Sequence, residues 1–283
     1  RKESMPNDAN DASDLTIFMV SCGQNPNHDD CLRAINSQTA VANGAKVGWV
    51  RNVAPMSAAF QKMIDCCGTR YFMQVDEDMI LQPDAAQAML ELIRAANGKK
   101  AFVVCLLHDT HLDKLIQGVK VYDRELMVKY PYNHEAISCE KEQLDRLRAD
   151  GYDILESSIV MGEHSPKWTT LGIFKRYLRL MAKWRQFSYS WLEHMPTKLL
   201  SMFLGDPSDI NYFAWKGADV VASNTDFTLA GEDDFRVIPN EYLIARSWFS
   251  KPTQSTFYLT DQCNLKCGWC LRQGDMSSVS PAT

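Results

Sequence analysis

Short apolar runs alternate with segments of helical composition along the first half of the chain, and this alternation constrains the fold more than any other feature. The apolar runs lie at residues 15–20, 46–50, 71–75 and 101–107. Strands buried on both faces read as continuous apolar runs, and strands that alternate with helices favour a parallel sheet covered on both sides. We therefore predict an α/β fold, in which a mostly parallel sheet is flanked by helices.

The composition is that of a globular protein without a membrane span. The 283 residues are 46% hydrophobic and 23% charged, which is ordinary globular usage. No stretch approaches the roughly 18 consecutive apolar residues of a membrane-spanning helix. The net charge of −5 argues against a protein that binds nucleic acid.

Nine cysteines, an odd number, and no signal-peptide pattern at the start of the sequence predict a reducing, cytoplasmic setting. Three of them are crowded within eight residues near the end of the chain. The other six are scattered or embedded in apolar runs, and we predict buried core thiols at these positions: Cys22, Cys31, Cys66, Cys67, Cys105 and Cys139.

An acidic triplet, Asp76-Glu77-Asp78, directly follows the apolar run at 71–75. Ligands of open α/β sheets bind outside the carboxyl ends of the strands, so these carboxylates are well placed for a site. Two Asp residues separated by one position suit Mg²⁺ or Mn²⁺, which favours carboxylates together with substrate phosphates. The alternative is a solvated acidic turn that caps the next helix.

The residues around this triplet resemble a known family. The run VRNVAPMSAAFQKMIDCCGTRYFMQVDEDMILQPDA and the earlier IFMVSCGQNPNHDDCLRAINSQT are similar to the nucleotide-sugar half of family 2 glycosyltransferases with the GT-A fold. The resemblance implies that Asp76 contacts the ribose and the metal, and that Asp78 binds the metal on the diphosphate. It also implies nucleotide contacts for Ser21, in the loop under the base, and for Asn52.

A second part of the resemblance concerns the acceptor half, carried by KVYDRELMVKYPY and SCEKEQLDRLRADGYDI. It implies that Glu140 is the general base of an inverting transfer, which takes the proton of the acceptor hydroxyl. Glu142 is the reserve candidate. The alternative is that both are first-turn acids that complement the dipole of the helix at 140–149.

Histidines follow two of the apolar segments. His164, in MGEHSPKW, stands where GT-A enzymes supply an additional metal ligand, and the alternative is an ordinary surface histidine. His108, Asp109 and His111 form the motif HDTH after the run at 101–107, and we predict that they line the acceptor side of the pocket. A turn with capping residues or a separate metal site are the alternatives.

A basic, aromatic-rich segment begins after residue 164. Residues 165–200 carry seven Lys or Arg against one acid, Glu193, and Phe174, Leu178 and Met181 recur at helical spacing. Such a helix can lie on a membrane surface, here through residues 171–195, which would make the acceptor lipid-linked. The alternative is a helix that packs its apolar stripe onto the sheet.

The three crowded cysteines have the spacing Cys263-x3-Cys267-x2-Cys270 after a short strand at 256–259. Three such thiolates can hold three irons of a 4Fe–4S cluster. The motif resembles radical S-adenosylmethionine (SAM) enzymes, whose SAM binds the open iron; a zinc knuckle or chance clustering are the alternatives. Only thirteen residues follow Cys270 and the chain opens on Arg1, so we expect a fragment of a longer protein.

Together these features predict four segments: a disordered tail at 1–14, a GT-A domain at 15–164, a basic helical extension at 165–250 and the truncated start of a radical SAM domain at 251–283. The predicted activity is a metal-dependent, inverting transfer of a sugar from a nucleotide-diphosphate donor to an unknown glycan, peptide or lipid-linked acceptor. The alternatives are a nucleotidyltransferase and a non-catalytic module that positions substrate for the radical SAM partner.

Overall fold

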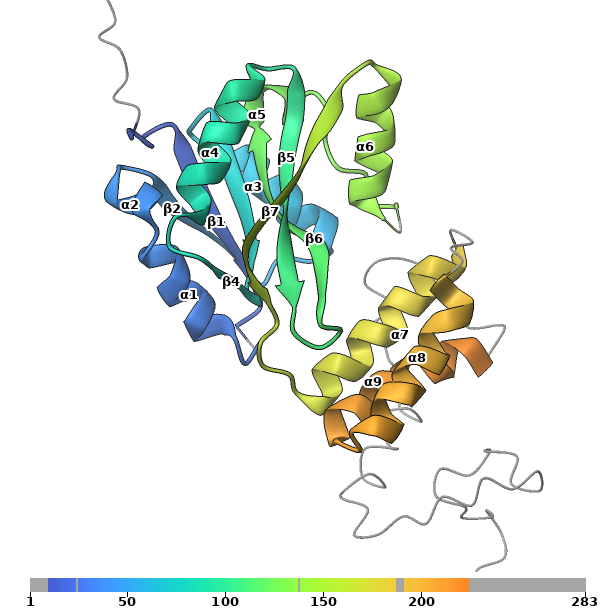
Figure 1. Ribbon diagram of the computed structural model, residues 1–283. Helices are drawn as coiled ribbons and strands as arrows, with labels where there is room; N and C mark the ends of the chain where they lie inside the picture. Colours follow the sequence, from blue (N-terminus) through green and yellow to red (C-terminus); the bar gives the residue numbers. More distant parts are fainter. Residues whose placement is uncertain (1–9, 24, 137, 187–190, 224–283) are drawn as a thin grey trace, which may run out of the picture. The chain divides into compact units, whose positions relative to one another are not determined.

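Seven strands form one mixed sheet in the computed structural model, which describes residues 10–23, 25–136, 138–186 and 191–223. The strand order is β2-β1-β3-β6-β5-β7-β4 (Figure 1). The strands are β1 (Leu15–Ser21), β2 (Lys46–Arg51), β3 (Tyr71–Asp76), β4 (Met79–Leu81), β5 (Lys100–Asp109), β6 (Lys114–Asp123) and β7 (Asp153–His164). The helices are α1 (His28–Asn36), α2 (Thr39–Ala42), α3 (Met56–Cys66), α4 (Ala85–Ala96), α5 (Arg124–Met127), α6 (Cys139–Ala149), α7 (Thr170–Gln186), α8 (Trp191–Gly205) and α9 (Asp209–Ser223).

Strand directions follow from the lengths of the connections. Strands β2, β1 and β3 pair in parallel, as do β5 and β7. Strand β6 is antiparallel to β5, because the connection between them, residues 110–113, is too short for a crossover. Strand β6 is also antiparallel to β3, and β4 is antiparallel to β7. The predicted α/β class with flanking helices is confirmed. The expected common direction holds for β1, β2, β3, β5 and β7, and the other two strands make the sheet mixed.

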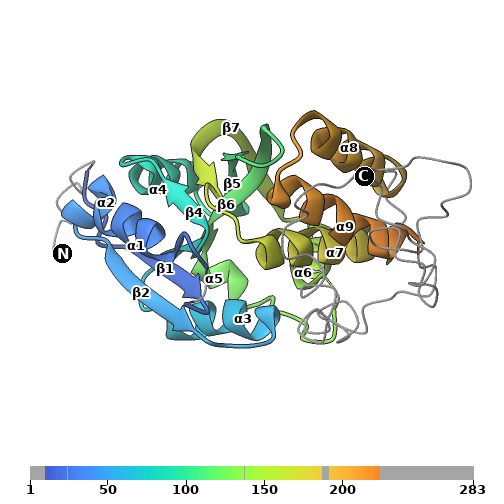
Figure 2. The same cartoon turned by 90° about the horizontal axis from the view of Figure 1, so that it is seen from below.

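Two hydrophobic cores cover the two faces of the sheet. Side chains alternate along β1, so Ile17 and Met19 belong to one core while Phe18 belongs to the other. The first core includes residues of α1, α2 and α4, and the second includes residues of α3, α5 and α6. The helices lie on the corresponding sides of the sheet in Figures 1 and 2. The helices therefore cover both faces of the sheet, and the polar side chains lie at its carboxyl edge.

The carboxyl ends of four strands meet at this edge. Ser21 ends β1, Asp76 ends β3, Asp109 ends β5 and His164 ends β7. Because these strands share one direction, polar residues from distant parts of the sequence come together there.

Helices α7–α9 belong to the same compact unit as the sheet. The predicted apolar stripe of α7 is buried, with Phe174 7%, Leu178 1% and Met181 0% exposed. It packs closely against α9 and contributes to neither core that flanks the sheet, in contrast to the expected packing onto the sheet. None of the helices in the described part of the chain is long and apolar enough to cross a membrane.

The cysteine prediction is correct for four of the six scattered residues and wrong for two. Cys31, Cys67, Cys105 and Cys139 are buried, whereas Cys22 and Cys66 are exposed. Cys66 ends α3 and Cys22 follows β1, so both stand where an element leaves its core. Cys263, Cys267 and Cys270, residues 1–9 of the predicted tail and residues 224–250 of the predicted extension lie outside the described residues.

Candidate active site

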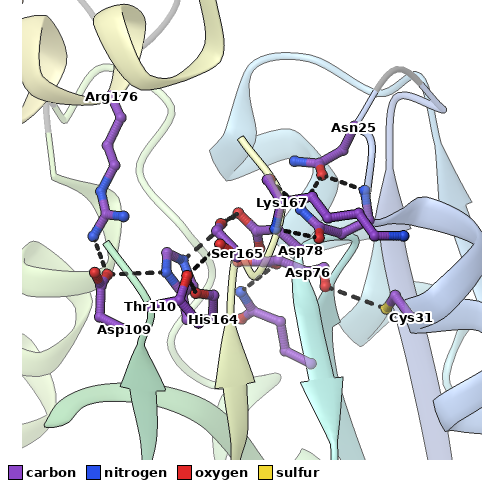
Figure 3. Close-up of polar contacts among 12 residues, drawn as sticks. Asn25, Cys31, Asp76, Asp78, Asp109, Thr110, His164, Ser165, Lys167 and Arg176 are labelled. Carbon is purple, nitrogen blue, oxygen red and sulfur yellow. Dashed lines mark hydrogen bonds and ion pairs between the residues drawn. The ribbon is translucent and has the colours of Figure 1, made fainter. Parts of the chain in front are cut away.

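The carboxyl edge brings together Asp76, Asp78 and His164, which are far apart in the sequence (Figure 3). Strand β4 pairs with β7 so that Met79 faces His164, and Asp78 therefore lies next to the end of β7. The Asp78 carboxylate accepts a hydrogen bond from Ser165 Oγ (3.1 Å), and its Oδ2 is 3.6 Å from His164 Nε2. The backbone reinforces this contact, since Ser165 N donates to the Asp78 carbonyl at 2.7 Å.

The surroundings of Asp76 disfavour the ionised form of its carboxylate. Burial and the neighbouring charge of Asp78 raise its pKa to about 6, although a hydrogen bond from Gln74 and the charge of Lys120 act in the other direction. Gln74 Nε2 donates to Asp76 Oδ1 at 3.1 Å. Two adjacent carboxylates of which one titrates late are an environment that a cation stabilises.

His164 is oriented by a second carboxylate. Its Nδ1 donates to Asp109 Oδ2 (3.2 Å), which leaves Nε2 on the side of Asp78 (Figure 3). Asp109 is fully buried and also accepts from Leu112 N at 2.8 Å. Metal-binding histidines usually have this arrangement: one ring N–H donates a hydrogen bond to a carboxylate, and the other ring nitrogen faces the metal.

The residue types at this edge fit Mg²⁺ or Mn²⁺. Within the described part of the chain no three His, Cys, Asp or Glu side chains stand together as a complete ligand set. These ions need no such set, because they take one or two carboxylates and complete their shell with water and substrate phosphates. The donors that would hold the ion are Asp78, Asp76 and His164 Nε2.

The middle residue of the acidic triplet has a different role, which the sequence did not indicate. Glu77 accepts hydrogen bonds from Ser21 Oγ (2.6 Å), Cys22 N (3.2 Å), Gly23 N (3.0 Å) and His28 Nδ1 (3.0 Å). Burial acts to raise its pKa, but these hydrogen bonds outweigh burial and the pKa is lowered. Strand alternation gives no signal for Glu77, because residues 77 and 78 form the turn between β3 and β4.

The two residues predicted on the nucleotide side lie at the exits of β1 and β2. The Ser21 hydroxyl donates to Glu77 and contacts His28 Nδ1 at 2.9 Å, so it fixes the start of the loop. Asn52 has a left-handed backbone with φ 52°, a conformation that asparagine tolerates well, and its N–H donates to the Ser21 carbonyl at 2.9 Å. Its side chain is exposed at the sheet edge.

Glu140 is the second residue of α6 and forms an ion pair with Lys120 of β6. Burial acts to raise the pKa of Glu140, but the Lys120 cation, together with the charges of Lys183 and Arg179, outweighs burial and holds the pKa below its usual value. The Asp76 charge also acts on Lys120, so this lysine connects Glu140 electrostatically to the acidic strand end. The sequence signal for Lys120 is a cation between the apolar residues Val119 and Val121 of β6.

The other predicted residues have separate partners. Glu142 forms an i,i+4 pair with Arg146 on α6, at 2.7 and 2.9 Å. The HDTH residues have separate partners: half-buried His108 pairs with Asp113 (2.8 Å), while Asp109 supports His164. His111 contacts Tyr177 OH of α7 (2.8 Å) and Asn211 of α9 (3.1 Å), and a place for this motif on the acceptor side stays a prediction.

The fold and the edge together define an α/β protein with a polar, acidic site at the carboxyl ends of its parallel strands. No family model and no curated protein matches the chain. Similar solved structures include a mannosyltransferase, PcManGT, from Pyrobaculum calidifontis in complex with GDP-Man and Mn²⁺ (12% identity, 87% of this chain and 86% of that chain, TM-score 0.47).

Two others are glucosyl-3-phosphoglycerate synthase from Mycobacterium tuberculosis with Mn²⁺, UDP and phosphoglyceric acid (13% identity, 54% of this chain and 71% of that chain, TM-score 0.39) and 4-diphosphocytidyl-2C-methyl-D-erythritol synthase from Anaerococcus prevotii (10% identity, 56% and 93%, TM-score 0.36). These likenesses are too weak to carry a function, which has to be inferred from this chain's own residues.

Proposed function

We propose that this chain is a glycosyltransferase that moves a sugar from a nucleotide-diphosphate donor to an acceptor hydroxyl and depends on Mg²⁺ or Mn²⁺. The observation that carries the proposal is the line from Asp109 to His164 Nδ1 and from His164 Nε2 to Asp78, beside Asp76 at the carboxyl ends of the strands. The sequence resemblance to family 2 glycosyltransferases supports the choice of sugar transfer among phosphate-dependent reactions.

In this proposal the residues at the edge bind and neutralise the donor. Asp76, Asp78 and His164 hold the cation, whose positive charge when bound stabilises the leaving diphosphate. Glu77 keeps the loop after β1 in place through its hydrogen bonds to Cys22 N and Gly23 N, and Ser21 and Asn52 lie on the nucleotide side. Asp109 keeps His164 in one orientation.

Glu140 is proposed as the general base of an inverting transfer. Its ion pair with Lys120 keeps the carboxylate ionised at neutral pH, so it is ready to take a proton. The acceptor oxygen loses that proton to Glu140 and bonds to the anomeric carbon, while the bond from that carbon to the diphosphate oxygen breaks. The products are the glycosylated acceptor and the nucleoside diphosphate, with the proton on Glu140.

A donor panel tests the proposal. Thermal shift with Mn²⁺ and uridine, guanosine or thymidine diphosphate sugars identifies the donor, and hydrolysis or transfer should then release nucleoside diphosphate. The Asp78→Asn variant should lose the shift and the release, whereas Asp65→Asn, at an exposed carboxylate on α3, should keep both. A product that retains the nucleoside monophosphate, without release of the nucleoside diphosphate, would show a nucleotidyltransferase instead, and no shift with any donor would favour a non-catalytic positioning module.

For Cys263, Cys267 and Cys270, which lie outside the described residues, the spacing alone supports a separate proposal. We infer that these thiolates ligate a 4Fe–4S cluster whose open iron would bind SAM. Anaerobic reconstitution with iron and sulfide should give the absorption and EPR signature of such a cluster. Cys267→Ala should abolish it while Cys66→Ala, at an exposed thiol, should not.

A further inference from the structure

The HDTH motif, residues 108–111, begins in the last two residues of β5 and leads away from the sheet into the helical part of the chain. Asp109 has no exposed surface and accepts a hydrogen bond and an ion pair from Arg176 of α7, in addition to the contacts from His164 Nδ1 and Leu112 N. Figure 3 shows the resulting line of side chains from Arg176 through Asp109 to His164. A cation from the helices therefore contacts the carboxylate that orients the proposed metal ligand.

The backbone around His164 is held independently of this line. Ser165 is fixed to Asp78 through its N–H and its hydroxyl. Lys167 exchanges two hydrogen bonds with the Asn27 side chain, at 2.8 and 2.9 Å. What these contacts leave open is the rotation of the imidazole ring, and the Asp109 carboxylate is the group that fixes it.

The attachment of the helices also has its own contacts. His111 Nδ1 contacts Tyr177 OH at 2.8 Å, and His111 Nε2 contacts Asn211 at 3.1 Å. Tyr177 is adjacent to Arg176 and fully buried, so the same turn of α7 carries one residue for attachment and another that contacts Asp109. The two functions can therefore be separated by substitution.

The contacts of Arg176 are unfavourable for a residue that serves only the stability of the fold. Its Nη1 is buried and has no hydrogen-bond partner among the described residues, and the guanidinium lies over the Trp168 ring at 4.9 Å. A buried ion pair contributes little net stability, and an unpaired buried N–H adds a further cost. A functional role for the Arg176 charge beside Asp109 would explain why the residue is there despite this cost.

We propose that Arg176 is a positioning residue for His164, acting through Asp109, so that helix α7 completes the metal site of the sheet. The guanidinium fixes the Asp109 carboxylate, the carboxylate fixes the imidazole, and Nε2 stays directed toward Asp78. This inference rests on the proposed cation site at Asp78 and His164.

The test is the affinity of the metal-free full chain for Mn²⁺ alone, read from the EPR signal of free Mn²⁺. Arg176→Ala should weaken binding by about 10–100-fold, the usual effect of removing a group that orients a ligand. Arg176→Lys, which keeps a cation beside Asp109, should recover part of the loss. Tyr177→Phe should lower the melting temperature but leave the Mn²⁺ affinity unchanged.

The His164→Ala variant distinguishes a failure of the proposed metal site from a failure of the proposed role of Arg176. If His164→Ala binds Mn²⁺ as the wild type does, the proposed metal site is wrong. If His164→Ala loses affinity while Arg176→Ala keeps it, the metal site stands and the role of Arg176 is overturned. Should Arg176→Ala fail to fold, Arg176→Lys carries the test, and an affinity equal to that of the wild type then counts against the proposal.

Discussion

At the scale of single residues, Asp76 shows a conflict between stability and function. Its folded pKa of about 6 lies above the ordinary aspartate value of 3.8, so the folded chain binds this proton more tightly than the unfolded chain. The metal-free protein therefore loses stability as pH rises from about 4 to 6. A charge that costs stability in the empty site is one that a bound cation would stabilise.

Asp76→Asn should accordingly stabilise the metal-free chain at pH 7, by on the order of 1–3 kcal/mol, since one pKa unit corresponds to about 1.4 kcal/mol. The difference from the wild type should vanish near pH 4, and Mn²⁺ with donor should stabilise only the wild type. Thermal melts of both proteins between pH 4 and 8 measure this. A variant that is less stable than the wild type at pH 7 without metal contradicts the prediction.

Lys120 gives a second prediction at this scale. Lys120 contributes most among the cations that lower the pKa of Glu140, so Lys120→Met should raise the pKa of that carboxyl, because burial is then opposed by fewer cations. We expect kcat to fall on the acidic side of its pH profile by about tenfold or more, within the usual contribution of a general base, and to recover at higher pH.

The measurement is kcat against pH at saturating donor and Mn²⁺, where the bound metal keeps Asp76 ionised. The acidic limb of the profile should move to higher pH. Lys100→Met removes an ion pair with Asp153 at the opposite end of β5 and should leave the profile in place. An unmoved acidic limb in Lys120→Met would exclude Glu140 as the group that limits the rate.

At the scale of elements, helix α7 shows what periodicity predicts and what it does not. The spacing of Phe174, Leu178 and Met181 correctly predicted a buried stripe. It did not predict the covering element, because a stripe specifies a face and not its partner. The partner is α9, whose Gly217 permits a close approach: a Cβ there would lie 2.3 Å from the Phe174 carbonyl oxygen.

Gly217→Ala should therefore destabilise the protein, although alanine favours helices by about 1 kcal/mol. The clash is with backbone, which cannot move aside as a flexible side chain would, and overpacking costs about 1–3 kcal/mol. Gly205→Ala, in α8, is the matched control because nothing lies within 4 Å of its added Cβ. Chemical denaturation should separate the two variants, and a Gly217→Ala protein as stable as the control would refute the close crossing.

At the scale of the whole molecule, the sequence predicted the sheet but only part of its edge. Apolar runs revealed four of the seven strands, and the rule for carboxyl ends pointed to Asp76 and Asp78, whereas His164 was proposed from the family resemblance. Arg176 and Lys120 were not predicted as site residues, because their importance depends on which carboxylate lies opposite in space. Local pattern identifies the element that carries a residue, whereas the identity of its partner is a property of tertiary structure.

The same dependence predicts how the sheet would behave without the helices. A chain shortened to residues 10–169 leaves the Asp109 carboxylate without Arg176 and His111 without Tyr177 and Asn211. Loss of one partner of a buried ion pair costs about 3–5 kcal/mol, so the shortened chain should melt well below the full chain or fail to fold.

The Asp109→Asn variant shows whether the shortened chain is destabilised by the unpaired Asp109 carboxylate or by a general loss of packing. In the full chain this change should be destabilising, because it removes the partner of Arg176. In the shortened chain it should be neutral or stabilising, because no cation remains for the carboxylate to pair with. Melting temperatures of the four proteins give the coupling directly. Equal destabilisation in both backgrounds would mean that His164 and Leu112 hold Asp109 without help from α7.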